Sequence, residues 1–149
     1  MTRILMVCLG NICRSPLAHG LLESKLNSQE YYVDSAGTAS YHIGSQPDRR
    51  SIKVALNAGI DISTQRARAF TVKDFDEFDY IYAMDESNYA DILRLSRNEN
   101  DSKKVKLFLV ANKSRFDKNV PDPYYGDMSD FEYVFDLINE TADLIAEGL

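Results

Sequence analysis

The chain has 149 residues, of which 44% are hydrophobic and 27% charged, so it is long enough to bury a core as one domain spanning residues 1–149. Its formal net charge of -6 argues against nucleic acid and anionic membranes as main partners. An anionic substrate would therefore need a local binding site.

Cys8 and Cys13 are the two cysteines of the chain. A disulfide between them would close too short a loop to stabilise a secreted fold, so free thiols and a cytoplasmic location fit better. The apolar run at residues 4–7 is too short for a signal peptide, and no segment is long enough to span a membrane. We therefore expect a cytoplasmic protein without a membrane partner.

Residues 4–7, Ile-Leu-Met-Val, are typical of a buried parallel strand. Ser15 and Pro16 are residue types that begin helices, which predicts a helix with Ser15 as its cap, ending near residues 27–28. Its apolar stripe is Ala18, Leu21, Leu22 and Leu26. The residues between the strand and this helix, called here the 8–15 loop, form a tight strand-to-helix connection.

A second strand is predicted at residues 31–34, and the small residues at 35–38 predict a turn that leaves the sheet. Pro47 and Asp48 predict the start of a second helix, and Gly59 predicts its end. Both helices follow strands, as in α/β proteins.

Residues 71–75 are expected to form a short helical turn, and residues 80–84 a third strand. Ser87 is expected to cap the helix after it. A charged connection at 97–104 leads to a fourth strand at 105–110.

Residues 111–127 are predicted to form a long loop, a feature that is often functional in a compact domain. Ser129 and Glu132 have the spacing of a capping box for the last helix. The chain is therefore predicted to be a single-domain α/β protein with a four-stranded parallel twisted sheet and helices on both faces, a Rossmann-like arrangement.

The 8–15 loop has the residues of an anion-binding site. Its backbone N–H groups and the helix N-terminus can converge on one point, where Cys8 is a nucleophile and Arg14 matches two phosphate oxygens. Gly10 allows close backbone approach and Asn11 tolerates the left-handed region. The expected phosphate-binding residues are Leu9, Gly10, Asn11, Ile12, Cys13, Arg14 and Ser15.

Three polar residues follow the predicted strands: Cys8 the first, Ser35 the second and Asp85 the third. The carboxyl ends of parallel strands meet at one edge of a sheet, where ligands bind. The sequence therefore predicts a single site at this edge.

The Cys-x5-Arg-Ser pattern of the 8–15 loop resembles the signature of the low-molecular-weight protein tyrosine phosphatase family. The resemblance extends in order over nearly the whole chain. It also covers Asp34-Ser35-Ala36-Gly37-Thr38, Met84-Asp85-Glu86-Ser87-Asn88 and Asp122-Pro123-Tyr124-Tyr125-Gly126-Asp127.

The resemblance implies a phosphocysteine mechanism with Cys8 as nucleophile, Arg14 as phosphate ligand and Asp122 as general acid and base. Asp122 with Pro123 alone is typical of a β-turn. The expected substrate is protein phosphotyrosine and the product inorganic phosphate. Neither a metal nor another cofactor is implied, because Arg14 and the loop amides carry the positive charge.

The resemblance also places Tyr124 and Tyr125 at the pocket rim, with Tyr41 at a variable aromatic position opposite them. Tyr41 and His42 can equally be plain exposed loop residues. Cys13 is either a plain buried thiol or, as the resemblance favours, the partner that protects an oxidised Cys8 by forming a disulfide. The expected oligomeric state is a monomer or a weak dimer, because the resemblance implies that the rim tyrosines can mediate weak self-association.

Supporting residues follow from the same resemblance. Ser35 is expected to bond the Asn11 side chain, and Gln65 stands where many relatives have a histidine of that network. Its place one turn into the first helix, and not the resemblance, leads us to expect that His19 faces solvent.

Three other functions remain open. A protein-arginine phosphatase of the same fold resembles this chain but has Thr where Ile12 stands, and Ile12 suits a flat aromatic ring better. An arsenate reductase would use cysteines beyond Cys13, which the chain lacks. A non-catalytic phosphate-binding module would need neither Cys8 nor Asp122.

Overall fold

The computed structural model describes residues 1–149 and contains one sheet of four parallel strands in the order β2-β1-β3-β4. The strands are β1 (Thr2–Cys8), β2 (Tyr31–Gly37), β3 (Tyr80–Ala83) and β4 (Val105–Leu107). The helices are α1 (Arg14–Lys25), α2 (Arg49–Asn57), α3 (Lys73–Glu77), α4 (Glu86–Arg94), α5 (Glu99–Lys103), the 3-10 helix η1 (Phe108–Ala111) and α6 (Met128–Gly148). The predicted four-stranded parallel α/β fold is confirmed.

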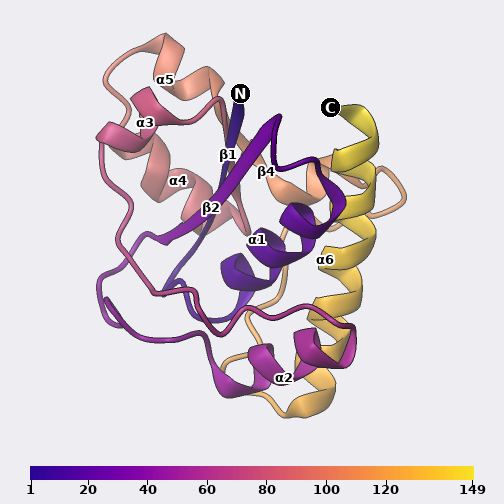
Figure 1. The fold of residues 1–149 in the computed structure, drawn as a ribbon. Helices are drawn as coiled ribbons and strands as arrows, with labels where there is room; N and C mark the ends of the chain where they lie inside the picture. The colour runs from indigo at the N-terminus through magenta and orange to yellow at the C-terminus, as the bar shows by residue number, and fades with distance from the viewer.

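The sheet separates two layers of helices. Figure 1 shows α1, α2 and α6 on one side of the strands and α3, α4 and α5 on the other. Each layer closes its own apolar core, a larger one under α1 and α6 and a smaller one under α4. The predicted helices on both faces are therefore present.

Strand β1 lies between the two cores. Its residues Ile4, Leu5, Met6 and Val7 are fully buried, because parallel strands alternate their side chains between two covered faces. Ile4 and Met6 pack with the larger core, whereas Leu5 and Val7 pack with the smaller one. This burial fixes the position of Cys8 at the end of the strand.

Three helix starts, those of α1, α4 and α6, differ from the predictions. Helix α1 begins at Arg14 without a side-chain cap, so the prediction that Ser15 caps it is wrong. Helix α4 is capped by Asp85, whose carboxylate accepts from the backbone N–H of Asn88, and not by Ser87.

The capping box of α6 is also shifted. It is formed by Asp127 and Asp130, not by Ser129 and Glu132, because Asp127 precedes the first helical turn and its carboxylate can reach the free N–H groups. The predicted start of α2 is confirmed, since Asp48 accepts from the backbone N–H of Arg50.

Several boundaries also moved. Strand β2 continues through Ser35 to Gly37 instead of turning after residue 34, since Gly37 still pairs with Cys8. Strand β4 ends at Leu107 and η1 takes the remaining residues of the predicted strand at 105–110. The 97–104 connection contains the short helix α5.

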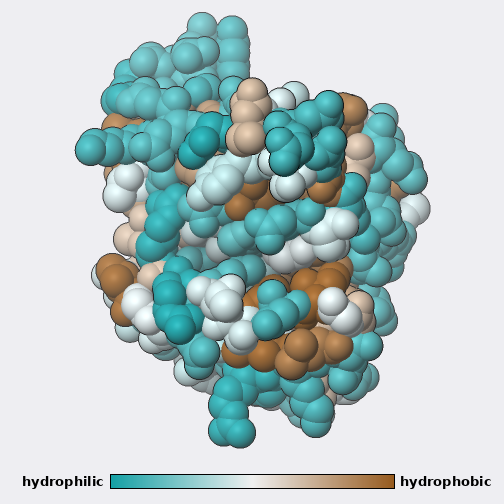
Figure 2. Space-filling view, in the orientation of Figure 1, coloured by the Kyte–Doolittle hydropathy of each residue, from teal (hydrophilic) through white to brown (hydrophobic).

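The surface seen in Figure 2 is mostly hydrophilic, with the largest hydrophobic patch in the lower part of this face and smaller hydrophobic groups above it and at its left edge. None of the helices, including the 21-residue α6, combines the length and the apolar character needed to cross a bilayer.

Candidate active site

The 8–15 loop connects the carboxyl end of β1 to α1, as predicted. Cys8 is 2% exposed at the end of the strand. Asn11 has a φ of 56°, the one positive φ outside glycine, in agreement with its predicted left-handed conformation. A Cβ on Gly10 would lie 3.1 Å from the His42 ring, so the loop backbone packs closely against His42, and the approach of Gly10 to a bound anion stays a prediction.

A chain of hydrogen bonds ends on the Cys8 sulfur. Asn11 Nδ2 donates to Ser15 Oγ at 2.7 Å, and Ser15 Oγ lies 3.0 Å from Cys8 Sγ. Because the amide nitrogen can only donate, Ser15 Oγ accepts from it and its own proton can point to the sulfur. A hydrogen bond donated to the sulfur stabilises its ionised form. Ser15 therefore serves Cys8 instead of capping α1.

Arg14 is a buried cation among three acceptors from two segments, the segment after β3 and the 112–127 loop. Its Nη1 lies 2.6 Å from Asp85 Oδ2 and donates to the Val120 carbonyl at 3.0 Å, and its Nη2 lies 3.7 Å from Asp122 Oδ2. Burial alone would lower the pKa of Arg14, but the facing Cys8 sulfur and the two carboxylates raise it above its ordinary value. Arg14 therefore stays charged at physiological pH.

The sequence predicted that Asp85 lies at the ligand-binding edge of the sheet, but it did not predict the contact of Asp85 with Arg14. One of its oxygens caps α4 and the other pairs with Arg14. The carboxylate thus fixes the guanidinium at the end of the pocket nearest β3. Its position directly after a predicted strand is the signal that could have indicated this role.

A second segment supports the 8–15 loop from outside. The backbone N–H of Arg68 donates to Asn11 Oδ1 at 3.1 Å, and the Arg68 side chain pairs with Asp34 and Asp74. A Cβ at Gly37 would lie 2.7 Å from the Leu9 carbonyl oxygen, so a larger residue cannot fit there. These contacts join residues far apart in sequence, and no local pattern predicts them.

The expected hydrogen bond between Ser35 and Asn11 is absent. Ser35 Oγ lies 3.2 Å from His19 Nδ1 instead, and His19 also pairs with Glu23. The prediction that His19 faces solvent is therefore wrong, because its side chain is only 12% exposed.

Gln65 lies outside the Asn11 network as well. Its Nε2 donates to the Pro16 carbonyl at 3.1 Å, and its buried Oε1 has no partner. Gln65 thus contacts the first turn of α1 and not the 8–15 loop. The amide that donates directly to Asn11 belongs to Arg68.

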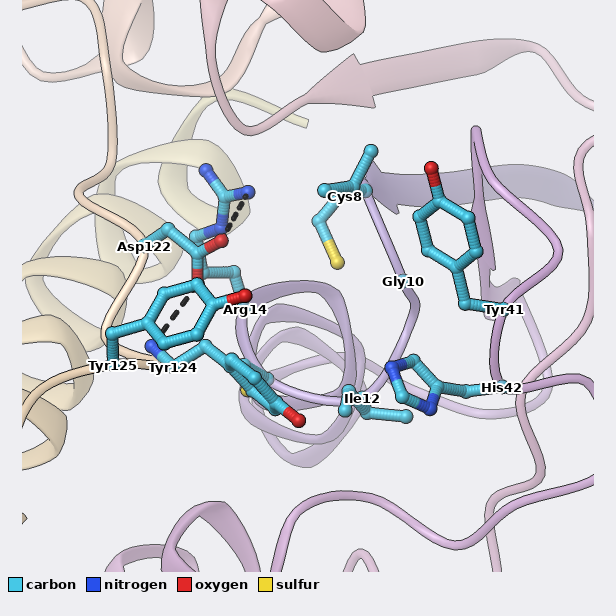
Figure 3. Close-up of a pocket in the computed structure, with 11 residues that line it drawn as sticks. Cys8, Gly10, Ile12, Arg14, Tyr41, His42, Asp122, Tyr124 and Tyr125 are labelled. Carbon is cyan, nitrogen blue, oxygen red and sulfur yellow. Dashed lines mark hydrogen bonds and ion pairs between the residues drawn. The ribbon is translucent and has the colours of Figure 1, made fainter.

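Asp122 lies in the loop at residues 112–127, which contains no helix or strand as predicted. Its side chain is 42% exposed, and its Oδ1 accepts from the backbone N–H of Tyr124 at 3.2 Å. Gly126 N donates to the Pro123 carbonyl at 2.9 Å, so a β-turn is present, but it spans residues 123–126 and begins one residue later than the turn expected with Asp122 first and Pro123 second. In Figure 3 the Asp122 carboxylate lies beside Arg14, on the side of the pocket facing Cys8.

Aromatic side chains surround the pocket opening. Figure 3 shows Tyr41 and His42 on one side, with Tyr124 and Tyr125 opposite. The Tyr124 and Tyr125 rings meet edge to face at 4.9 Å between centroids, and Tyr125 is 94% exposed. The pocket residues are Cys8, Leu9, Gly10, Ile12, Cys13, Arg14, Tyr41, His42, Asp122, Tyr124 and Tyr125. A planar aromatic group can therefore contact the rim while its anionic end reaches Cys8.

Cys13 lines the same pocket as a free, buried thiol. Burial, aided by the charge of Asp48, raises its pKa far above the ordinary value. Cys13 is thus a neutral thiol at physiological pH. No group of His, Cys, Asp and Glu side chains is arranged to bind a metal ion.

The sequence and the fold are both similar to known phosphatases. Residues 3–149 match the family described as low molecular weight phosphotyrosine protein phosphatase. The chain is 42% identical to the human protein of that name, over 89% of this chain and 85% of the relative, and 37% identical to the Saccharomyces cerevisiae protein, over 91% and 87%.

Among solved structures, a protein tyrosine phosphatase from Entamoeba histolytica has a TM-score of 0.92 at 36% identity, covering 97% of this chain and 94% of that chain. Vibrio vulnificus Wzb in complex with benzylphosphonate has a TM-score of 0.89 at 28% identity, covering 99% of both. With a thiol, a guanidinium and a carboxylate converging on one pocket, the chain belongs to the low molecular weight phosphotyrosine protein phosphatase family.

Proposed function

We propose that this protein hydrolyses phosphotyrosine in protein substrates through a phosphocysteine formed on Cys8. The observation that carries the proposal is the convergence of Cys8, Arg14 and Asp122 on one pocket with an aromatic rim. Each of the three residues offers a different function: nucleophile, anion ligand and proton carrier.

In the first step the Cys8 sulfur attacks phosphorus in line with the tyrosyl oxygen. The S–P bond forms as the P–O bond to the ring breaks, and Asp122 gives its proton to the departing oxygen. Arg14 and the backbone N–H groups of the 8–15 loop neutralise the equatorial phosphoryl oxygens. Tyrosine leaves and phosphocysteine remains.

In the second step water attacks the phosphocysteine. The Asp122 carboxylate takes a proton from this water as the new O–P bond forms and the S–P bond breaks. Inorganic phosphate is released, the sulfur returns to its ionised form and Asp122 is protonated again. Arg14 is buried and permanently charged, so it supplies the charge compensation for which many phosphoryl-transfer enzymes use a metal ion.

The rim supports an aromatic substrate. Tyr124 and Tyr41 offer ring faces on opposite sides of the pocket, and the apolar Ile12 lies at its wall, where a flat ring packs better than a guanidinium. The related Wzb structure contains benzylphosphonate, which combines an aromatic ring with a phosphoryl-like group.

We further propose that the enzyme acts in the cytoplasm as a monomer or weak dimer and is sensitive to oxidation. Both cysteines are free thiols that line one pocket, which supports a disulfide between Cys8 and Cys13 after Cys8 is oxidised. The exposed Tyr125 ring supports weak self-association through the rim.

The proposal is tested by hydrolysis of matched phosphotyrosine and phosphoarginine peptides in EDTA, with and without reductant. We expect fast phosphotyrosine turnover that survives EDTA and is lost on oxidation of Cys8. Selective turnover of phosphoarginine would be consistent with the proposed mechanism but would contradict phosphotyrosine as the substrate. Phosphate binding without turnover of either peptide would contradict the catalytic proposal.

A further inference from the structure

Arg50 lies outside the pocket lining, yet its side chain joins α2 to the loop that contains Asp122. Its Nη1 donates to the Gly126 carbonyl and its Nη2 to the Tyr124 carbonyl, each at 2.9 Å. The same guanidinium forms a bidentate pair with Asp48, with both hydrogen bonds at 3.0 Å. Two of these four hydrogen bonds link segments more than 70 residues apart in sequence, and the other two hold the guanidinium against Asp48 at the start of α2.

The start of α2 is in turn bonded to the 8–15 loop. The backbone N–H of Asp48 donates to the Ile12 carbonyl at 2.8 Å, and Ser51 Oγ donates to the Cys13 carbonyl at 3.2 Å. Asp48 thus has two contacts. Its backbone N–H bonds the 8–15 loop, and its carboxylate bonds the Arg50 guanidinium. Together Asp48 and Arg50 connect the segment of the nucleophile to the segment of the acid.

The plane of the Arg50 guanidinium is fixed from a third direction. Its Cζ lies 4.3 Å from the centre of the Phe131 ring in α6, and Phe131 is fully buried. A guanidinium stacked on an aromatic ring keeps its N–H groups free for in-plane acceptors. A lysine ammonium has neither the planar shape nor enough donors in one plane to replace it.

The two carbonyls that Arg50 bonds belong to the short turn that Asp122 begins. Tyr124 N donates to Asp122 Oδ1, and Gly126 N donates to the Pro123 carbonyl. Asp122 itself is substantially exposed, and its contact with Arg14 is long at 3.7 Å. The position of its carboxylate therefore depends on how the turn is anchored.

We propose that Arg50 is a positioning residue for the general acid. It does not touch substrate; it fixes the turn at residues 122–126 against α2, so that Asp122 stays within reach of the leaving oxygen above Cys8. The inference rests on the proposed phosphatase function and predicts that loss of Arg50 weakens proton transfer more than phosphate binding.

The test compares Arg50→Lys and Arg50→Met, alone and combined with Asp122→Asn, on aryl phosphates whose leaving groups range from acidic to weakly acidic phenols. We expect each Arg50 variant to lower kcat/KM by about tenfold for the poorest leaving groups and by about twofold for the best. Inhibition by inorganic phosphate should stay nearly unchanged. In the Asp122→Asn background the Arg50 variants should lose less than about twofold further, because the group they position is already gone.

Arg49→Lys is the matched control, because Arg49 is the exposed neighbour on the same turn of α2, and it should leave all rates unchanged. Circular dichroism and thermal unfolding establish that each variant is folded; Arg50→Met keeps an unbranched side chain but removes the guanidinium that stacks on Phe131. An equal loss for all leaving groups, or the same loss with and without Asp122, would overturn the inference while leaving the function intact. A wild-type protein that hydrolyses none of the esters would instead overturn the proposed function and the inference with it.

Discussion

The 8–15 loop and the 112–127 loop meet at one pocket but are built in opposite ways. In the first, the polar residues Asn11, Arg14 and Ser15 are almost completely buried and bond one another or the sheet edge. In the second, Asp122 is 42% exposed and Tyr125 is 94% exposed. One loop is part of the core, and the other lies on the surface.

This difference matches the two tasks of the proposed reaction. Charges that stay constant through turnover, such as that of Arg14, gain from burial because fixed dipoles and charges act strongly where water is excluded. Asp122 must lose and regain a proton in every cycle, so contact with solvent suits it. The buried loop would then supply electrostatic stabilisation, and the exposed loop proton transfer.

Replacement of Cys8, the nucleophile in the buried 8–15 loop, should abolish the reaction. Cys8→Ser is expected to lower phosphotyrosine hydrolysis to background, because a neutral hydroxyl cannot replace the sulfur as the attacking atom. Phosphate binding, measured by calorimetry, should persist. Substantial steady-state turnover by Cys8→Ser would contradict the covalent mechanism.

Replacement of Asp122 in the exposed 112–127 loop should impair proton transfer and leave the other steps nearly unchanged. Asp122→Asn is expected to lower kcat/KM by about 10²–10³-fold for poor leaving groups and much less for good ones. The measurement is the dependence of kcat/KM on leaving-group acidity. An equal loss across the series would show that Asp122 has no role in proton transfer.

The hydrogen bond to the sulfur can be tested apart from turnover. Ser15→Ala should slow alkylation of Cys8 by iodoacetate at neutral pH by about tenfold, the size of one hydrogen bond to a charged group. Cys13 is the internal control, because its raised pKa should keep it unreactive at the same pH. Mass spectrometry of the two cysteine peptides measures both rates, and an unchanged Cys8 rate would contradict the role of Ser15.

The left-handed backbone at Asn11 allows a smaller test of the buried loop. Asn11→Ala and Asn11→Gly both remove the side-chain bonds to Ser15 and Arg68, but only glycine adopts a φ of 56° freely. The alanine variant should therefore be less stable than the glycine variant by about 1 kcal/mol in the free energy of unfolding. Urea unfolding measures the difference, and equal stabilities would argue against strain at this position.

The Asp48–Arg50 pair should give a small dependence of stability on pH. Burial opposes ionisation of Asp48, but its hydrogen bonds to Arg50 lower its pKa below the ordinary 3.8. The folded form therefore holds the proton less tightly than the unfolded chain. The pair stabilises the fold above pH 3.8, and this contribution is lost as pH falls below that value. Asp48→Asn should remove this part of the acid dependence of urea unfolding, and an unchanged pH profile would contradict it.

The parts predicted correctly from sequence depend on neighbouring residues. The apolar run of β1, the apolar stripe of α1 and the 8–15 loop with its left-handed Asn11 each follow from side-chain types within a few residues. The edge of the sheet that carries the site followed from the order of strands and helices alone.

Two of the errors, at Ser15 and at His19, share one physical cause. Ser15 has the residue type of a helix cap, but its hydroxyl bonds the Cys8 sulfur, so a competing tertiary contact decides its role. His19 looked solvent-facing from its helical position, but the extension of β2 past Asp34 brings Ser35 against it. Both errors arise where a helix side chain bonds a partner outside its own helix.

The residues that the sequence did not reveal share this property. Arg50 and Arg68 contact segments that lie far away in the chain, and each is one of several arginines without a distinguishing local pattern. Their roles become visible only when the sheet and α2 are placed in three dimensions. The supporting contacts of this site are therefore less predictable than the residues they support.

The most direct test of the account is to trap the covalent intermediate. The enzyme is mixed with a good aryl phosphate, quenched in acid within the first turnovers and digested for mass spectrometry. We predict one phosphoryl group on the peptide that contains Cys8 and none on Cys13, with the adduct absent from Cys8→Ser. Burst release of the phenol without any phosphoryl group on Cys8, or a phosphoryl group on another residue, would contradict the proposed mechanism.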